Sequence, residues 1–163
     1  MLIILGGLPG VGKTSIARAL ARELGAIHVS VDSIEEAIGP SGMSGPANDE
    51  AGYRVGYAVA RDNLQLGRIV LADSVNPLPE TRDAWLGVAT DARAPFSEVE
   101  IVCSDAGELF RRVEQRHRAG AGPSWLEVVG RDYRAWHREH LVIDTARLTV
   151  DDAVAFIRAA ILP

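Results

Sequence analysis

The feature that most constrains this chain is the octapeptide at residues 7–14, Gly-Leu-Pro-Gly-Val-Gly-Lys-Thr. It satisfies the phosphate-binding pattern G-x-x-x-x-G-K-[ST] at every fixed position. A short apolar run, Leu2–Gly6, precedes it, and residues 13–24 carry apolar side chains at helical spacing. The glycines let backbone N–H groups approach phosphate oxygens, and the start of a helix adds partial positive charge. A strand, this loop and a helix in this order predict a nucleoside triphosphate site, although a chance glycine-rich turn is the alternative.

Lys13 is the only lysine in the chain, beside sixteen arginines. A compact ammonium reaches between two phosphates better than a broad guanidinium fork does. We therefore expect Lys13 to contact the β- and γ-phosphates of ATP and the Thr14 hydroxyl to bind Mg²⁺. The residues assigned to nucleotide binding are Gly7, Leu8, Pro9, Gly10, Val11, Gly12, Lys13, Thr14 and Ser15.

Length and composition predict one soluble domain over residues 1–163. Hydrophobic residues make up 47% of the chain and charged residues 24%, which are ordinary values for a globular protein. The net charge of −5 argues against broad binding to nucleic acids or membrane surfaces. A single cysteine, Cys103, excludes an intramolecular disulfide, and no signal peptide or membrane-length apolar run is present. We expect a cytoplasmic protein, whose oligomeric state the sequence does not indicate.

Short apolar segments alternate with helical patterns along the chain. The expected strands cover residues 2–6, 26–31, 68–73, 99–103 and 141–143. The expected helices cover residues 13–24, 32–38, 50–66, a segment ending at 90, and residues 105–118, 124–137 and 151–161. This order predicts an α/β fold, a P-loop NTPase three-layer sandwich with about five parallel strands and helices on both faces. Residues 39–48, rich in Gly, Pro and Ser, are expected to form a loop near the substrate, and residues 105–137 a short helical lid.

Two aspartates follow predicted strands. Asp73 ends an apolar strand at the edge where ligands bind in parallel sheets, so it could hold Mg²⁺ directly or through water. Its alternative is a helix-capping or turn-forming role. Asp32 lies one residue beyond the second strand, where a carboxylate could accept the proton of a substrate hydroxyl that attacks the γ-phosphate. Its alternative is to cap the next helix.

The helix at residues 105–118 is rich in arginine. Arg112 and Arg116 are four residues apart, so they share a face and cannot easily neutralise each other's repulsion without an anionic partner. We expect both to clamp the transferring phosphoryl group when the lid closes. A solvated charged face is the alternative, and it accounts better for Arg111 and Arg118. The histidines at 28, 117, 137 and 140 lack metal-ligand spacing and receive no catalytic role.

Together, the loop at residues 7–14, Val31-Asp32-Ser33-Ile34, Asp73 and the arginine-rich helix resemble the small P-loop kinases. The resemblance is to the AAA-type ATP-binding proteins and their relatives: chloramphenicol phosphotransferase, zeta toxin, gluconate kinase and the kinase half of polynucleotide kinase. It spans residues 2 to about 162. It implies that Asp32 is the general base and that Arg112 and Arg116 are lid arginines. Polynucleotide and adenylylsulfate kinases have an arginine three residues after the aspartate. This chain has Glu35 there, which favours a neutral or cationic acceptor.

The expected function is ATP- and Mg²⁺-dependent transfer of a phosphoryl group to a hydroxyl of a small molecule, with Lys13, Asp32, Arg112 and Arg116 as catalytic residues. One alternative is a regulatory nucleotide-binding ATPase, which Ser74 disfavours because it stands where a water-orienting Glu or Gln would follow Asp73. A nucleic-acid 5′-hydroxyl kinase is a further alternative, disfavoured by the net charge and Glu35.

Overall fold

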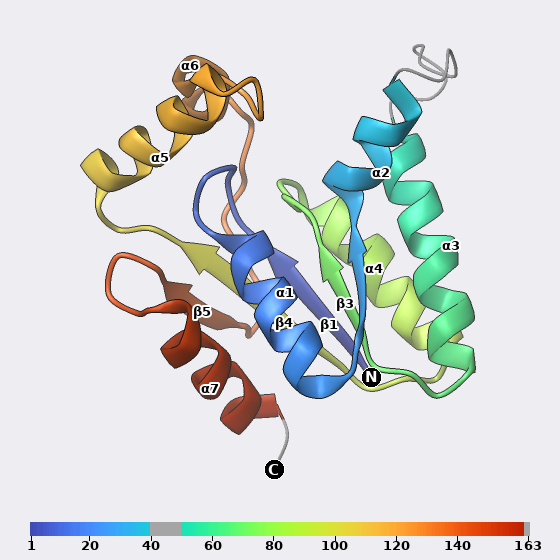
Figure 1. Cartoon of the computed structure of the whole chain (residues 1–163). Helices are drawn as coiled ribbons and strands as arrows, with labels where there is room; N and C mark the ends of the chain where they lie inside the picture. The colour runs from blue at the N-terminus through green and yellow to red at the C-terminus, as the bar shows by residue number, and fades with distance from the viewer. Residues whose placement is uncertain (40–49, 162–163) are drawn as a thin grey trace.

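A sheet of five parallel strands forms the centre of the computed structural model, which describes residues 1–39 and 50–161. Its strands are β1 (Leu2–Gly6), β2 (Ile27–Ser30), β3 (Val70–Asp73), β4 (Phe96–Val102) and β5 (Leu141–Asp144), in the spatial order β2-β3-β1-β4-β5. The helices are α1 (Lys13–Leu24), α2 (Val31–Ile38), α3 (Ala51–Gln65), α4 (Pro79–Asp91), α5 (Ala106–Arg118), α6 (Trp125–Val129) and α7 (Val150–Ile161) (Figure 1). The predicted fold class is confirmed. The glycine- and proline-rich loop expected at 39–48 lies almost wholly outside the described residues.

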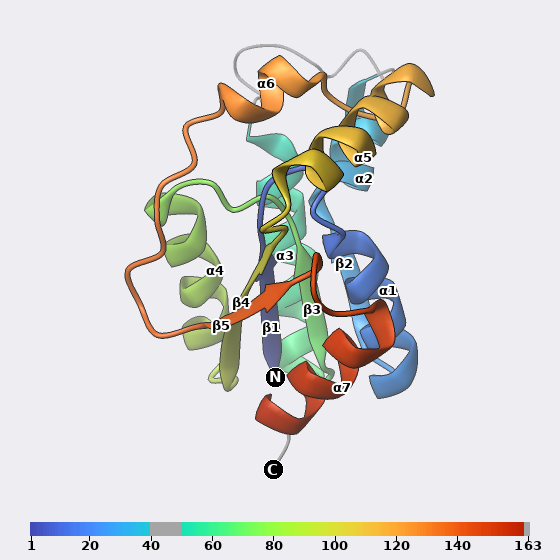
Figure 2. The ribbon, with the colours of Figure 1, turned by 90° about the vertical axis from the view of Figure 1, so that its left-hand side faces the viewer.

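The central strand β1 supplies side chains to two hydrophobic cores because successive residues of a strand point to opposite faces. Ile3 and Leu5 pack with apolar residues of α1 and α7 on one face. Leu2 and Ile4 pack with residues of α3 and α4 on the other. All four side chains are fully buried, which explains the continuous apolar run that begins the chain. Figure 2 shows α1 and α7 on one side of the sheet and α4 on the other.

The strand register brings the carboxyl ends of β1, β2 and β3 to one edge. Leu5 and Ser30 both lie opposite Asp73, on its two sides. The loop that follows β1, the helix that follows β2 and the carboxylate that ends β3 are therefore neighbours. α5 and α6 lie over the same edge (Figure 1). The predicted site residues thus come together because of topology, although they are separated by up to about a hundred residues in the sequence.

The segment after α6 differs from the sequence prediction. The helix expected at residues 124–137 ends at Val129, and residues 130–140 form an extended segment without helix or strand, which we name the strap. The strap covers the polar side of β4, where the Arg138 guanidinium binds both carboxylate oxygens of buried Glu98 and Tyr133 donates to Glu100. The helix prediction was wrong, and the strap instead supplies side chains that bind the carboxylates of Glu98 and Glu100 on this face of the sheet.

Within the described ranges, none of the helices has the length and apolar character that a bilayer span requires.

Candidate functional site

A cavity of about 1100 Å³ opens at the carboxyl edge of the sheet. Its walls come from the loop at residues 7–14, the start of α1, the helices α2 and α3, the lid and the segment after β5. The charged side chains in these walls are Lys13, Arg18, Asp32, Glu35, Glu36, Arg112, Arg116 and Arg131. The three carboxylates all come from α2. The cavity thus has an acidic side formed by α2 and a basic side formed by the loop, α1 and the lid.

The loop between β1 and α1 has a backbone that requires glycine. Gly7, Gly10 and Gly12 have φ angles of 139°, 88° and 101°, in the left-handed region that residues with a Cβ seldom adopt. A Cβ at Gly7 would also overlap the carbonyl oxygen of Ile101 in β4. The loop is fixed to the segment that follows β3 by a hydrogen bond of 3.0 Å from Gly7 N–H to the Val75 carbonyl. Gly10, Gly12, Lys13, Thr14 and Ser15 line the cavity, as a phosphate-binding loop requires.

Lys13 is 5% exposed, and its Nζ donates to the carbonyl of Leu8 at 3.2 Å. Burial lowers the pKa of this amine, Asp73 and Asp32 oppose the shift, and Arg116 and Arg131 lower the pKa further. Anionic phosphates beside the amine would raise its pKa again. A bound anion would therefore stabilise the charged form of Lys13.

Asp32 lies in the first turn of α2 and lines the cavity with its exposed carboxylate. The sequence alternative, in which Asp32 caps this helix, is wrong. The cap is Ser30, whose Oγ accepts a hydrogen bond from Ser33 N–H at 3.3 Å. The Asp32 carboxylate is therefore not needed to cap the helix, and the role of Asp32 as the base stays a prediction.

The acidic side also contains Glu35, one turn along α2 from Asp32. The Glu35 side chain packs against Gly52 of α3, where a Cβ would overlap it. Burial raises the pKa of Glu35, Asp32 raises it further, and Arg131 opposes both. Tyr53 of α3 lines the same side, and its hydroxyl accepts a hydrogen bond from Asn76 N–H at 3.1 Å. An anionic group would meet repulsion on this side.

Asp73 is 3% exposed and does not belong to the residues that line the cavity. Its Oδ2 is 3.1 Å from Nε2 of His28, to which the sequence analysis gave no role. The register of β2 and β3 explains this pair, since Ser30 lies opposite Asp73 and His28 is two residues earlier on the same strand face. The sequence positions of His28 and Asp73 in their strands predict this contact only once the register of β2 and β3 is known.

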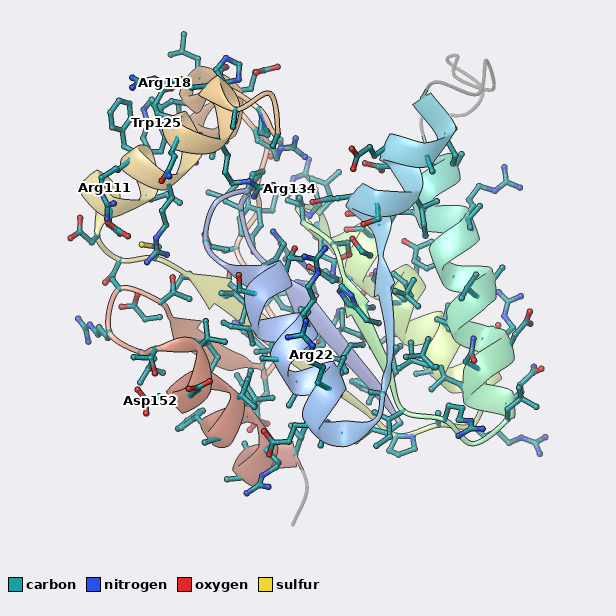
Figure 3. All side chains as sticks on the ribbon, in the orientation of Figure 1. Arg22, Arg111, Arg118, Trp125, Arg134 and Asp152 are labelled. Carbon is teal, nitrogen blue, oxygen red and sulfur yellow. The ribbon has the colours of Figure 1, made fainter. Side chains whose placement is uncertain are left out.

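The lid arginines have different surroundings. Arg112 donates from Nε to Glu108 Oε1 at 2.6 Å and from Nη1 to Thr145 Oγ1 at 3.0 Å. Glu108, one turn earlier on the same helix, is thus an anionic partner for Arg112, whose role at the phosphoryl group stays a prediction. Arg116 lines the cavity without an ion pair in the described part of the chain. Figure 3 shows Arg111 and Arg118 on the outer part of the lid, consistent with a solvated role.

Arg131 is a cavity residue that the sequence analysis missed. It follows Gly130 at the start of the strap, outside the arginine-rich helix α5. The helix expected at residues 124–137 included Arg131, but that helix ends at Val129, and only the path of the strap brings Arg131 to the cavity. Arg18 of α1 also lines the cavity and was not predicted.

The oxygen donors at the site fit Mg²⁺, a cation that prefers oxygen ligands and shares them with substrate phosphates. The Thr14 hydroxyl lines the cavity and has no hydrogen bond to the described residues. The Asp73 carboxylate has no lysine or arginine ion pair in the described ranges, and Lys13 is within its electrostatic reach. Groups of three or more His, Cys, Asp or Glu side chains able to hold a metal do not occur in those ranges. A metal here would therefore depend on ligands from a bound nucleotide.

Comparisons with known proteins agree with this architecture. Residues 2–140 match the family model described as AAA domain. The cytidylate kinase of Methanopyrus kandleri is 28% identical over 184 residues, an alignment that covers 100% of this chain and 94% of that protein. A structure from Chloroflexus aurantiacus has a TM-score of 0.79 with 21% identity and covers 97% of this chain and 96% of that one. The APS kinase CysC of Mycobacterium tuberculosis, solved with AMPPNP and APS, has a TM-score of 0.75 with 22% identity over 97% of this chain and 95% of that one. Each of the two structural similarities extends over 97% of this chain.

Proposed function

The chain belongs to the AAA domain family and has the fold of the small P-loop kinases, and on this premise we propose that it transfers the γ-phosphate of ATP to a hydroxyl of a small molecule. The observation that carries the proposal is that one cavity has both a buried lysine in a phosphate-binding loop and an exposed carboxylate, Asp32, on its acidic side. Phosphoryl transfer depends mainly on positioning and electrostatics, so these groups are a sufficient inventory.

In the proposed reaction the acceptor hydroxyl loses its proton to Asp32 as its oxygen forms a bond to Pγ. The bond between Pγ and the β,γ-bridging oxygen breaks, and its electron pair leaves with ADP. Lys13 and the backbone N–H groups of the loop neutralise the charge on the phosphates. Thr14, and Asp73 through water, would hold Mg²⁺, which supplies charge neutralisation for the β- and γ-phosphates when bound.

The acidic side supports a neutral or cationic acceptor. An acceptor with a phosphate, such as the nucleoside monophosphate that a cytidylate kinase name implies, would bring its charge close to Asp32, Glu35 and Glu36. None of the arginines of the cavity belongs to α2 or α3. A regulatory ATPase would need a group that orients water, and buried Ser74 follows Asp73 instead.

An acceptor panel with matched charges tests the proposal. Glucose and glucosamine differ in charge on one pyranose scaffold, and gluconate is an open-chain carboxylate with the same six carbons. Cytidine with CMP, and chloramphenicol with adenosine 5′-phosphosulfate, extend the panel. The expected result is ATP-dependent phosphorylation of neutral or cationic members, detected by ³¹P NMR, above a slow background of inorganic phosphate. Hydrolysis that is fast and independent of every acceptor would favour the regulatory ATPase. Retention on single-stranded nucleic acid at moderate salt, with phosphorylation of its 5′-hydroxyl, would favour the third alternative.

A further inference from the structure

Arg131 and Arg116 are the two lid arginines that line the cavity without an ion pair in the described ranges, and Arg131 differs in acting on the acidic side as well. It lines the cavity, and its charge acts on both Lys13 of the basic side and Glu35 of the acidic side. Its side chain has no hydrogen bond or ion pair to the described residues. Arg112, by contrast, is bound by Glu108 and Thr145. A guanidinium that lines the cavity within electrostatic reach of both sides can meet a phosphoryl group that passes from one to the other.

The strap that carries Arg131 is fixed by another arginine. Arg82 of α4 is 1% exposed and donates to strap carbonyls, from Nη1 to Ala135 at 3.1 Å and from Nη2 to Arg134 at 2.5 Å. The same guanidinium donates to the carbonyls of Asn76 at 2.9 Å and Pro77 at 3.0 Å. Arg82 therefore connects the strap to the segment that follows Asp73.

Further contacts hold the strap against the start of the phosphate-binding loop. Arg134 N–H donates to the Pro77 carbonyl at 2.9 Å, and the Trp136 ring lies 4.5 Å from the Arg82 guanidinium. A Cβ at Gly6 would overlap the Trp136 ring, so the strap packs directly on the last residue of β1. The Asn76 side chain donates to the carbonyl of Leu5 at 3.0 Å, which joins the same strand to the Arg82 cluster. The backbone that leads to Arg131 is thus fixed relative to the loop.

The chemistry of Arg82 is unusual for a packing residue. No carboxylate pairs with this guanidinium in the described ranges, and carbonyl oxygens are its hydrogen-bond partners. Burial lowers the pKa of Arg82, because removing the charged guanidinium from water is unfavourable. An apolar side chain of similar volume fills such a space at a smaller cost, but it cannot hold two segments by directed hydrogen bonds. The fixed position of the strap is what the buried charge provides.

We propose that Arg131 is a catalytic residue that binds the transferring phosphoryl group, and that Arg82 is the positioning residue that holds it there through the strap. This proposal rests on the phosphotransferase function proposed above. As the bond from Pγ to the β,γ-bridging oxygen breaks and the bond to the acceptor oxygen forms, the Arg131 guanidinium donates hydrogen bonds to the nonbridging oxygens of Pγ. It neither gains nor loses a proton, and the acceptor proton goes to Asp32.

The test compares binding of a ground-state mimic, AMPPNP, with binding of ADP in the presence of aluminium fluoride, which mimics the planar phosphoryl group. Arg131→Ala should bind AMPPNP within about threefold of the wild type while its affinity for ADP–aluminium fluoride falls about 100-fold, the effect of one lost transition-state donor. The turnover number should fall by a similar factor. Arg134→Ala is the matched control, because this exposed arginine of the strap pairs with Asp132 and does not line the cavity (Figure 3). It should leave both affinities unchanged.

Arg82→Lys tests the positioning role. It should weaken ADP–aluminium fluoride binding about tenfold, keep AMPPNP binding, and cause no additional loss when combined with Arg131→Ala, because both changes remove one interaction. A merely structural role would lower both affinities together, and the losses of the two variants would add. That additive result would overturn the role of Arg82.

Arg131→Ala changes an exposed side chain, so it tests the catalytic role even if Arg82→Lys does not fold. Wild-type affinity of Arg131→Ala for ADP–aluminium fluoride would overturn the inference while leaving the proposed function intact. A wild-type protein that neither binds ADP more tightly with aluminium fluoride nor phosphorylates any acceptor would overturn both.

Discussion

The two sides of the cavity are built in different ways. The loop at residues 7–14 is a local structure, in which consecutive residues supply the glycines, Lys13 and Thr14. The acidic side combines α2 with α3, and Glu35 reaches its place only because Gly52 leaves room for it. A local motif specifies phosphate binding from sequence alone, whereas acceptor selection depends on the packing of separate helices. Substitutions on the acidic side should therefore leave nucleotide binding unchanged but alter the choice of acceptor.

The largest expected effect is on the basic side. Lys13→Ala should reduce phosphoryl transfer about 1000-fold, because it removes the buried cation of the phosphate-binding loop and a positive charge within electrostatic reach of Asp73. Lys13→Arg keeps the charge and should still lose most activity, since a guanidinium does not fit the space of the ammonium. Steady-state kinetics with ATP measure both. Activity of Lys13→Arg near the wild-type level would contradict the role given to the compact ammonium.

A smaller effect is expected on the acidic side. Glu35→Gln preserves shape but removes a charge, so the ratio of kcat/KM for glucosamine over glucose should fall about fivefold, the effect of roughly 1 kcal/mol of lost attraction. The KM for ATP should not change. A change in the KM for ATP with no change in acceptor preference would reverse the assignment of the two sides.

The same carboxylate predicts a pH dependence, because the pKa of Glu35 is raised in the fold. As the solution is acidified, Glu35 should lose its charge, and with it the attraction for a cationic acceptor, at a higher pH than an ordinary glutamate would.

The smallest expected effect on catalysis concerns Tyr53. Tyr53→Phe leaves Asn76 N–H without its acceptor, so the free energy of unfolding should fall by about 1–3 kcal/mol while transfer stays within about threefold. Urea denaturation and kinetics measure the two quantities. Tyr57→Phe is the matched control, since that hydroxyl donates to the Thr81 carbonyl at 3.4 Å and does not line the cavity. A 100-fold loss of transfer in Tyr53→Phe alone would give Tyr53 a chemical role.

The sequence predicted the parts of the site that depend on local pattern. The loop, its flanking strand and helix, and the positions of Asp32 and Asp73 at one edge follow from motif and topology, and the fold class is confirmed. The strap was missed because its order comes from Arg82 and Gly6, which are distant in sequence from residues 130–140. The residues 97–101, Ser-Glu-Val-Glu-Ile, did contain a signal. Their alternation indicates one polar face of β4, which an amphipathic helix would not cover.

The side-chain partners of the arginines could not be predicted either. Arg112 and Arg116 look equivalent at helical spacing. Of these two arginines, however, Arg112 is the one that donates hydrogen bonds to Thr145, which follows β5. The pairing of His28 with Asp73 similarly requires the register of β2 and β3. Spacing along one element predicts which residues share a face, and tertiary packing decides which of them remain free for a ligand.

The central claim is that Asp32 accepts the acceptor proton while the loop holds ATP. The most direct test measures ATP affinity by calorimetry and phosphoryl transfer from [γ-³²P]ATP in a single turnover, for the wild type, Asp32→Asn and Glu36→Gln. Glu36 serves as the control because it lines the cavity but has no assigned role in proton transfer. The account predicts unchanged ATP affinity in all three proteins, with transfer reduced about 10²–10⁴-fold in Asp32→Asn alone. Near-wild-type transfer in Asp32→Asn would contradict it.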